Sequence, residues 1–330
     1  MLLISYGTRP EYIKVKPLIA ELSKRGSIAF KILFTGQHQD IAPESGDYTL
    51  TIDEEGHRLD SIITSMLNKN HIWEGITHVL VQGDTTSAFA VALAAMNRRV
   101  KIIHLEAGLR TFDYNNPFPE EYNRQLISRI SSINLCPTKL NWDNLDNENC
   151  VGETYLVGNT VLDNLVGQDS SYSDEVLVTM HRRENLELIP KWFRTINSIA
   201  LSNPHLKFIC PLHPNPEIQE HKDLLSNVEV IEPLPYDQMV KKIATCRFII
   251  TDSGGIQEEA SFFNKKCIIC RKQTERTETL GVTSYLCHYP EDLFSLVEKV
   301  KGDYISDEVC PYGDGHASEK IVNILENIIK

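Results

Sequence analysis

The sequence predicts an α/β protein with two Rossmann-like domains, each built on a doubly wound parallel sheet. Short apolar segments alternate with helical patterns along nearly all 330 residues, and this alternation is typical of parallel sheets with helices on both faces. The pattern runs once through each half of the chain, which is long enough for two hydrophobic cores. A loop-like stretch over residues 159–174 separates the runs, so we predict domains at 1–165 and 166–330.

The first half contains six apolar segments that predict strands and three helical patterns between them. Pro10 suits the first turn of the first of these helices. The predicted strands span residues 2–6, 29–35, 77–82, 100–105, 133–136 and 154–157. The predicted helices span residues 10–25, 85–98 and 120–131.

The second half repeats the plan with five strands and four helices. The predicted strands span residues 175–179, 206–210, 228–231, 247–251 and 266–270, and the predicted helices span 188–202, 216–225, 236–245 and 256–263. A last helix over 318–330 belongs either to the second domain or, by packing, to the first.

Composition excludes several classes of protein. The net charge of −12, from 45 acidic and 33 basic residues, argues against nucleic acid or an anionic membrane as a partner. No apolar run approaches the roughly 20 residues of a membrane span, and the first residues are predicted to form a strand rather than a signal peptide. Eight cysteines are scattered, and the close pair Cys267 and Cys270 points to opposite faces of a strand, so we expect free thiols in the cytoplasm and no metal site.

Polar residues follow the predicted strands, where ligands bind in open α/β sheets. Arg9 and Lys14 come after the first strand and either bind an acidic group or belong to a capped, solvated helix start. Asp84 follows the third strand and Glu106 the fourth, and a loop over 113–119 leads to Glu120. Three converging carboxylates would raise one another's pKa values and suit proton transfer. The alternatives are that Asp84 is a helix N-cap and that Glu120 merely begins a helix.

In the second half, residues 251–260 read TDSGGIQEEA. Ser253, Gly254 and Gly255 would place backbone N–H groups at a helix N-terminus, which is a ready site for phosphate. The alternative is a tight turn without a ligand. Glu259, one turn into that helix, is placed to accept hydrogen bonds from sugar hydroxyls.

Basic residues follow other strands of the second half, namely His181 and Arg182 after its first strand, His213 after its second, and Arg276 further on. A cation beside a diphosphate explains them better than a metal, since no HExxH spacing accompanies the histidines. Motifs for a tightly held nicotinamide, for ATP hydrolysis and for a nucleophilic serine elbow are absent from the sequence. Together with the phosphate site, these residues predict an enzyme acting on a nucleotide sugar.

Ten motifs in order closely resemble the non-hydrolysing UDP-N-acetylglucosamine 2-epimerases over about residues 3–285. They are GTRPEYIKVKPL, TGQH, VQGDTT, HLEAGLRTFD, PFPEEYNR, VGNTVLDNL, HRREN, LHPNP, TDSGGIQEEA and TERTETLGV.

The resemblance implies a GT-B fold, with two Rossmann-like domains facing across a cleft, and usually a homodimer. It implies interconversion of UDP-GlcNAc and UDP-ManNAc for polysaccharide precursors, without NAD or an obligatory metal. A base removes the proton at carbon 2 while UDP departs from carbon 1, and the resulting 2-acetamidoglucal is reprotonated on its other face before UDP returns.

By motif position, the resemblance assigns three groups of residues. Asp84, Glu106 and Glu120 match the catalytic carboxylates, and His181 matches the histidine that steadies the departing UDP. The UDP contacts match Arg9, Ser253, Gly254, Gly255 and, at the ribose, Glu259.

The chain departs from the family pattern in three respects. It is short between Gly36 and Thr77, and Thr277 replaces the usual proline. Some members bind a second, allosteric UDP-GlcNAc at positions matching Gln37, His38, Arg182 and His213. This chain differs there in having Asp40 and a short segment after Gly36. Related enzymes act on 6-deoxy UDP-2-acetamido-L-sugars, and others hydrolyse the substrate to ManNAc and UDP, so both remain alternatives.

Overall fold

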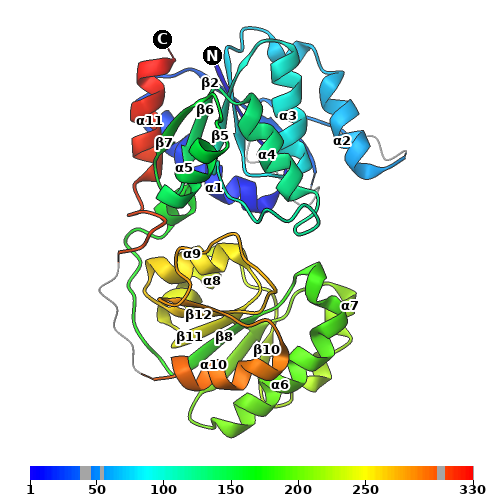
Figure 1. The fold of residues 1–330 in the computed structure, drawn as a ribbon, viewed down its shortest axis with the longest axis vertical. Helices are drawn as coiled ribbons and strands as arrows, with labels where there is room; N and C mark the ends of the chain where they lie inside the picture. The colour runs from blue at the N-terminus through cyan, green and yellow to red at the C-terminus, as the bar shows by residue number, and fades with distance from the viewer. Residues whose placement is uncertain (38–45, 53–55, 303–308, 330) are drawn as a thin grey trace. The chain divides into compact units, whose positions relative to one another are not determined.

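The protein is described by a computed structural model that covers residues 1–37, 46–52, 56–302 and 309–329 (Figure 1). The chain divides into two compact units. Unit 1 comprises Met1–Asn164 and Tyr312–Lys330, and unit 2 comprises Leu165–Pro311. Each contains one sheet in which all the neighbouring strands pair in parallel, so the predicted α/β class is confirmed.

The sheet of unit 1 has the strand order β3-β2-β1-β4-β5-β6-β7. Its strands are β1 (Leu2–Tyr6), β2 (Phe30–Phe34), β3 (Tyr48–Thr49), β4 (His78–Gln82), β5 (Lys101–Leu105), β6 (Ile133–Cys136) and β7 (Glu153–Leu156). Its α-helices are α1 (Arg9–Arg25), α2 (Arg58–Leu67), α3 (Thr86–Asn97), α4 (Glu120–Ile130), α5 (Lys139–Asn147) and α11 (Ala317–Ile328). The 3₁₀ helices η1 (His71–Trp73) and η2 (Thr160–Asn164) complete it.

Alternating side chains of these strands enter two cores, one on each face of the sheet, because successive residues of a strand point to opposite sides. Leu3 and Val79 belong to the core that α2, α3 and α4 cover. Their neighbours Ile4 and Leu80 belong to the core that α1 and α11 cover. Burial on both faces explains why these strands read as continuous apolar runs.

The sheet of unit 2 has the order β10-β9-β8-β11-β12-β13, which repeats the order of the first six strands of unit 1. Its strands are β8 (Glu175–Thr179), β9 (Lys207–Pro211), β10 (Glu229–Ile231), β11 (Phe248–Thr251), β12 (Lys266–Ile269) and β13 (Ser284–Leu286). Its α-helices are α6 (Ile189–Ser202), α7 (Pro216–Gln219), α8 (Tyr236–Thr245), α9 (Gly254–Phe262) and α10 (Leu293–Val300). Its 3₁₀ helices are η3 (Arg183–Leu188), η4 (Lys222–Leu224) and η5 (Pro290–Asp292).

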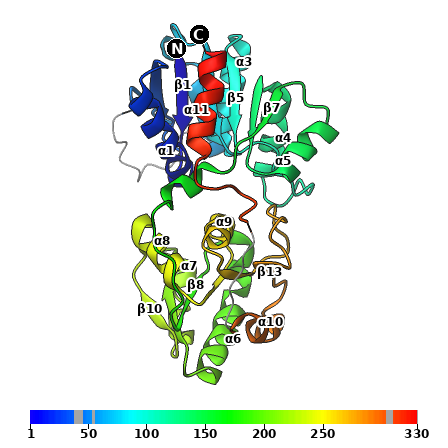
Figure 2. The same ribbon diagram turned by 90° about the vertical axis from the view of Figure 1, so that its left-hand side faces the viewer.

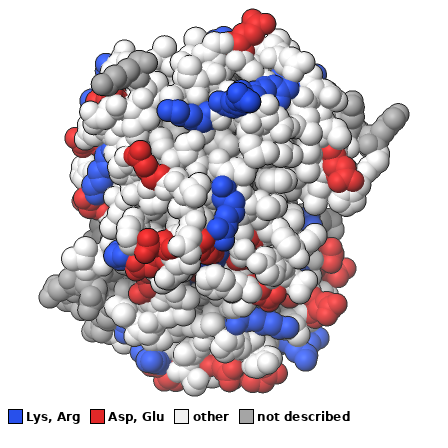
Figure 3. Space-filling model, turned by 45° about the horizontal axis from the view of Figure 1, so that its top comes forward, with Lys and Arg blue, Asp and Glu red and all other residues white. Residues whose placement is uncertain are grey.

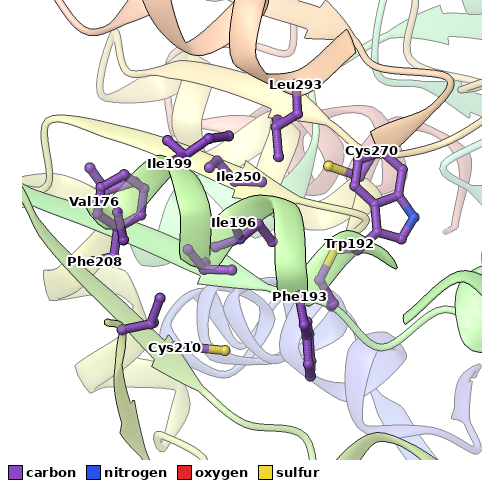
Figure 4. Close-up of a cluster of buried hydrophobic side chains, with 14 of the residues drawn as sticks. Val176, Trp192, Phe193, Ile196, Ile199, Phe208, Cys210, Ile250, Cys270 and Leu293 are labelled. Carbon is purple, nitrogen blue, oxygen red and sulfur yellow. The ribbon is translucent and has the colours of Figure 1, made fainter. Parts of the chain in front are cut away.

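The larger core of unit 2 lies between its sheet and helices α6 and α10 (Figure 4). Trp192, Phe193 and Ile196 project from α6 toward strand residues such as Phe208 and Ile250, and all five side chains are buried. This amphipathic packing fixes β8 and β11, whose ends carry the residues discussed below.

Helix α11 packs against α1 in unit 1 (Figure 2), which is one of the two positions that the sequence left open. The sequence patterns did not predict β3, β13, α2, α5 or α10. The single helix predicted over 216–225 is two short ones, α7 and η4.

In the part of the chain that the structure describes, no helix is long and apolar enough to cross a membrane. Charged side chains of both signs are interspersed with uncharged ones on the face in Figure 3.

Candidate functional site

Both sheets have a topological switch point, where successive connections leave in opposite directions along the sheet. The switch lies between β1 and β4 in unit 1 and between β8 and β11 in unit 2. Ligands of open α/β sheets bind beyond the carboxyl ends of the strands at such points. Nearly all the predicted site residues follow these four strands or their neighbours β5 and β9.

Glu106, directly after β5, is the most heavily constrained carboxylate of unit 1. Lys14 Nζ lies 2.5 and 2.6 Å from its two carboxylate oxygens, and the Asn159 amide donates to Oε1 at 3.3 Å. The Gln82 side-chain amide donates to Oε2. Glu106 is nearly buried and has a φ of +66°, a conformation that non-glycine residues adopt rarely and that is often found at functional sites.

Asp84, the second residue after β4, is held by an arginine. Its Oδ2 accepts from Arg124 Nε at 3.0 Å and from Nη2 at 2.5 Å, and about a quarter of its side chain is exposed. The turn of Asp84 also approaches Glu106, because a Cβ on Gly83 would lie 3.7 Å from Glu106 Oε2. Two predicted catalytic carboxylates therefore occupy adjoining strand ends. Thr85, not Asp84, is the N-cap of α3, since its side chain accepts from the Ala88 N–H.

The two acidic residues at the start of α4, Glu120 and Glu121, have different surroundings. Glu121 is fully buried and accepts from the backbone N–H groups of Thr111 and Phe112 and from Arg124 Nη1, so it braces the loop before α4. Glu120 is half-buried and lies one helical turn from Arg124, on the same face of α4. Glu120 thus shares a helix face with the arginine that holds Asp84.

The turn after β1 carries the predicted basic residues. Thr8 caps α1 in a reciprocal capping box with Glu11. Arg9 is exposed at the first position of α1, whereas Lys14 is partly buried against Glu106. The structure thus supports both interpretations of this segment, because the helix start is capped and Lys14 also reaches a carboxylate of the site.

In unit 2, the N-terminus of α9 follows β11 as predicted. Ser253 is the N-cap residue, but its hydroxyl makes no capping hydrogen bond. Gly254 begins the helix, and a Cβ there would come within 2.5 Å of Arg276 Nη1. Only a residue without a side chain lets this guanidinium approach the first turn of α9.

Arg276 is buried between two carboxylates, because its Nε lies 2.5 Å from Glu258 Oε1 and its Nη1 contacts Glu275. Gln257 holds the same segment by donating to Arg276 O at 2.6 Å. A cation at the positive end of a helix is electrostatically unfavourable by itself. The carboxylates offset that cost and keep Arg276 beside Gly254.

His181, after β8, is held by Asp252, a residue that the sequence analysis did not select. His181 Nδ1 lies 3.2 Å from Asp252 Oδ1, and the His181 ring stacks on that of His213 with centroids 5.8 Å apart. Burial lowers the pKa of both imidazoles below the usual value, and the negative charge of Asp252 opposes this effect. Neutral imidazoles are therefore favoured at neutral pH in the protein without a ligand.

Two further predicted residues lie in the same unit. Arg182 is half-buried, and its backbone N–H donates to Asp252 Oδ2 at 2.9 Å. Glu259 Oε1 accepts from the Tyr236 hydroxyl at 2.9 Å. Burial and this carboxylate raise the pKa of Tyr236 far above its usual value, so the phenol stays a hydrogen-bond donor.

Sequence reasoning missed the residues that hold the predicted ones in place. Gln82, Arg124 and Asn159 in unit 1 and Asp252 in unit 2 all belong to motifs that were recognised as motifs, without being assigned a contact. The available signal was position in the chain, since Asp252 directly follows β11 and Asn159 lies three residues after β7. His38 and Asp40 lie outside the described residues. The described residues contain no group of three or more His, Cys, Asp or Glu side chains that could hold a metal ion.

Known proteins match this sequence along nearly its whole length. The sequence model of a family described as UDP-N-acetylglucosamine 2-epimerase matches residues 20–326. The UDP-N-acetylglucosamine 2-epimerase of Campylobacter jejuni is 36% identical, and the match covers 98% of this chain and 97% of that protein. The Bacillus subtilis protein of the same name is 35% identical, over 97% of this chain and 93% of its own.

Solved structures give the same result for the fold. The UDP-GlcNAc 2-epimerase of Neisseria meningitidis, solved with bound UDP-GlcNAc, matches with a TM-score of 0.88 and 33% identity over 99% of both chains. The Methanocaldococcus jannaschii enzyme, in complex with UDP-GlcNAc and UDP, matches with a TM-score of 0.83 and 29% identity over 99% of both chains. The kitacinnamycin glycosyltransferase shares only 12% identity at a TM-score of 0.62, a likeness of fold alone, in agreement with the predicted GT-B class.

Proposed function

The chain belongs to the UDP-N-acetylglucosamine 2-epimerase family, and on that premise we propose that it is an isomerase that converts UDP-GlcNAc into UDP-ManNAc without releasing a free sugar. The observation that carries the proposal is the pair of carboxylates at adjoining strand ends, Asp84 and Glu106, each fixed by its own cation. Inverting carbon 2 requires removal of a proton from one face and delivery of a proton to the other. Two positioned carboxylates suit that task.

The residues of unit 1 are proposed to carry the proton transfers. A carboxylate takes the proton at carbon 2, the C–H electron pair forms the C1–C2 double bond, and the C1–O bond breaks with its electrons leaving on UDP. In the second half of the reaction, a carboxylic acid protonates carbon 2 on the opposite face and UDP attacks carbon 1. We assign these roles to Asp84, Glu106 and Glu120 as a group.

The lysine and arginine of unit 1 orient these acids. Lys14 and Arg124 make charge-assisted hydrogen bonds to Glu106 and Asp84, and such bonds are stronger and more directional than neutral ones. A base that is already oriented requires no reorganisation when the substrate binds. Arg9, exposed at the start of α1, is proposed to contact the diphosphate.

The residues of unit 2 are proposed to hold the leaving group. The first N–H groups of α9, at Gly254 and Gly255, and the Ser253 hydroxyl suit a diphosphate. Arg276 and His181 add positive charge as the C1–O bond breaks, and preorganised charge of this kind lowers the barrier. Glu259 is proposed to accept hydrogen bonds from the ribose, with Arg182 and His213 as further phosphate contacts.

Proton NMR with UDP-GlcNAc in deuterated water tests the reaction. Deuterium at carbon 2, with UDP-ManNAc forming and no free sugar, is the expected result. Free ManNAc and UDP would instead assign the chain to hydrolysing enzymes, and absence of any exchange would direct the test to 6-deoxy UDP-2-acetamido sugars.

A matched pair of variants then locates the proton chemistry. Asp84→Asn should abolish most exchange at carbon 2 while UDP still binds. Asp143→Asn is the control, because Asp143 belongs to an exposed ion pair with Lys139 on α5. Unchanged exchange in Asp84→Asn would remove Asp84 from the mechanism.

Two further properties are proposed from family membership. We propose a homodimer, which sedimentation velocity would establish, and unit 1 exposes large apolar side chains, among them Phe112, Phe118 and Leu126, that a partner subunit could cover. We also propose that the protein works in the cytoplasm. All eight cysteines are free, which agrees with a reducing compartment, and fractionation of the source cells tests it.

A further inference from the structure

We propose that Asp252 is a positioning residue for His181, fixing both the ring and the main chain from which it projects, so that Nε2 is presented to the leaving diphosphate. The proposal rests on the function proposed above, in which His181 contacts UDP. It assigns to the β11–α9 turn a second task besides carrying the phosphate-binding N–H groups.

The carboxylate of Asp252 is completely buried, and its hydrogen-bond donors come from the segment that follows β8. It accepts from the backbone N–H groups of His181 at 3.0 Å and of Arg182 at 2.9 Å. It also accepts from Asn185 Nδ2 at 3.1 Å, and that amide donates in turn to Cys270 O at 2.9 Å. A buried carboxylate with this many donors holds one orientation, since any rotation would break several charge-assisted bonds.

The same carboxylate faces one particular nitrogen of the imidazole. His181 Nδ1 lies 3.2 Å from Asp252 Oδ1, so the neutral ring carries its proton on Nδ1, where it can donate to the carboxylate. Nε2, on the other side of the ring, points away from Asp252. Protonation of Nε2 then produces an imidazolium whose free N–H is available to a phosphate oxygen.

The charged groups around His181 decide how readily that protonation occurs. Asp252 favours the imidazolium, whereas Arg182, His213, Arg271 and burial disfavour it. An arriving diphosphate would add negative charge and so promote protonation when the ligand is present. Without Asp252, only groups that disfavour the imidazolium would remain around His181 in the protein without a ligand.

A purely structural role for Asp252 predicts different results. If Asp252 only holds the turn, its removal would affect stability, and the reductions of kcat caused by removing Asp252 and by removing His181 would multiply in the double variant. As a positioning residue that acts through the imidazole, its removal should cost nothing further once the imidazole is gone.

A double-mutant cycle on the full chain separates the two roles. We expect Asp252→Asn, which keeps the shape and one acceptor, to lower kcat roughly 10- to 100-fold and to move the alkaline limb of the pH–rate profile, where His181 loses its proton, to lower pH. In a His181→Asn background, the same change should alter kcat by less than about 2-fold. Losses that multiply, or an unmoved profile, would overturn the proposal. Asp174→Asn is the matched control, since Asp174 pairs with Arg247 on the exposed side of the same unit, and it should leave kcat unchanged.

A second readout needs no activity and so tests the inference separately from the proposed function. The chain has 11 histidines, and in ¹⁵N-histidine-labelled protein the His181 signals are identified by their loss in His181→Asn. In the native chain without ligand, we expect the neutral His181 to be protonated on Nδ1. The Nε2–H tautomer would overturn the positioning role even if Asp252→Asn failed to fold. The expected tautomer without any carbon 2 exchange would leave the positioning intact and contradict the epimerase proposal alone.

Discussion

Lys265, directly before β12, is a lysine without exposure to solvent. Its ammonium donates to the Ser171 carbonyl and lies 3.5 Å from the centroid of the Tyr172 ring. Burial lowers its pKa to about 8, although these contacts compensate part of the lost hydration. One residue thus ties the start of unit 2 to the segment before β12 and makes the stability of this unit depend on pH.

The pH dependence of stability follows from the sign of that shift. Because the pKa is lower in the folded chain than the ordinary 10.5, the unfolded chain binds more protons between about pH 8 and pH 10.5, and stability rises with pH there. Lys265→Met removes this contribution. Its unfolding free energy relative to the native chain should fall by up to roughly 3 kcal/mol from pH 7 to pH 10, as measured by denaturant unfolding. Lys24→Met, at an exposed lysine, should show a constant difference, and so would Lys265→Met if the lysine were solvated.

At the scale of elements, a single carboxylate joins the two turns at the switch point of unit 1. Glu11 Oε2 accepts from the backbone N–H groups of Gly7 at 2.8 Å and Thr8 at 2.6 Å, and its Oε1 accepts from the Thr85 hydroxyl at 2.7 Å. Thr85 caps α3 directly after Asp84. Glu11 therefore sets the spacing between the turn with Arg9 and the turn with Asp84, much as Asp252 does between β8 and β11.

Glu11→Ala should destabilise unit 1 by roughly 2–4 kcal/mol, because two buried backbone N–H groups lose their acceptor at roughly 1–3 kcal/mol each. The measurement is the midpoint of urea unfolding together with the rate of carbon 2 exchange. Glu21→Ala on the same helix is the control, since Glu21 pairs with Lys24 and Arg25 along the helix and its loss should cost at most about 0.5 kcal/mol. Equal losses of stability in the two variants would show that Glu11 does not hold the two turns together.

The elements that sequence reasoning predicted are those whose signal is local. Strands buried on both faces read as apolar runs, and the ends of α1 and α3 lie within a residue or two of prediction. The two-residue β3 and three-residue β13 are short edge strands, each paired with a single neighbouring strand, and their local sequence carries little strand signal. The carboxylates of the site were predictable because they follow strands. Their partners Arg124 and Lys14 lie on helices remote in sequence, where only the folded chain brings them to Asp84 and Glu106.

At the scale of the whole molecule, the chain leaves unit 1, builds unit 2 and returns. Helix α11 places Ile321, Val322 and Leu325 in the core that Leu18 and Leu22 of α1 share. Arg25, at the end of α1, also pairs with Glu326 at 3.2 Å. The final helix is therefore part of the first hydrophobic core, not an appendage to unit 2.

Leu325→Ala should lower the stability of unit 1 by roughly 2–5 kcal/mol and leave unit 2 unaffected. Hydrogen exchange followed by mass spectrometry resolves the two, and faster exchange is expected in peptides from residues 2–34 but not in those from 175–270. Asn327→Ala, at an exposed position of the same helix, is the control. Loss of protection in both units would mean that they unfold as one.

Because α11 returns to unit 1, the two units are not completed in the order in which their synthesis begins. Residues leave the ribosome from the N-terminus onward, and unit 2 is contiguous while unit 1 is not. Unit 2 can close as soon as Pro311 emerges, whereas the apolar face of α1 stays uncovered until α11 is made. Unit 1 is thus translated first but completed last, and a nascent chain that stalls before α11 carries a complete unit 2 and an incomplete unit 1.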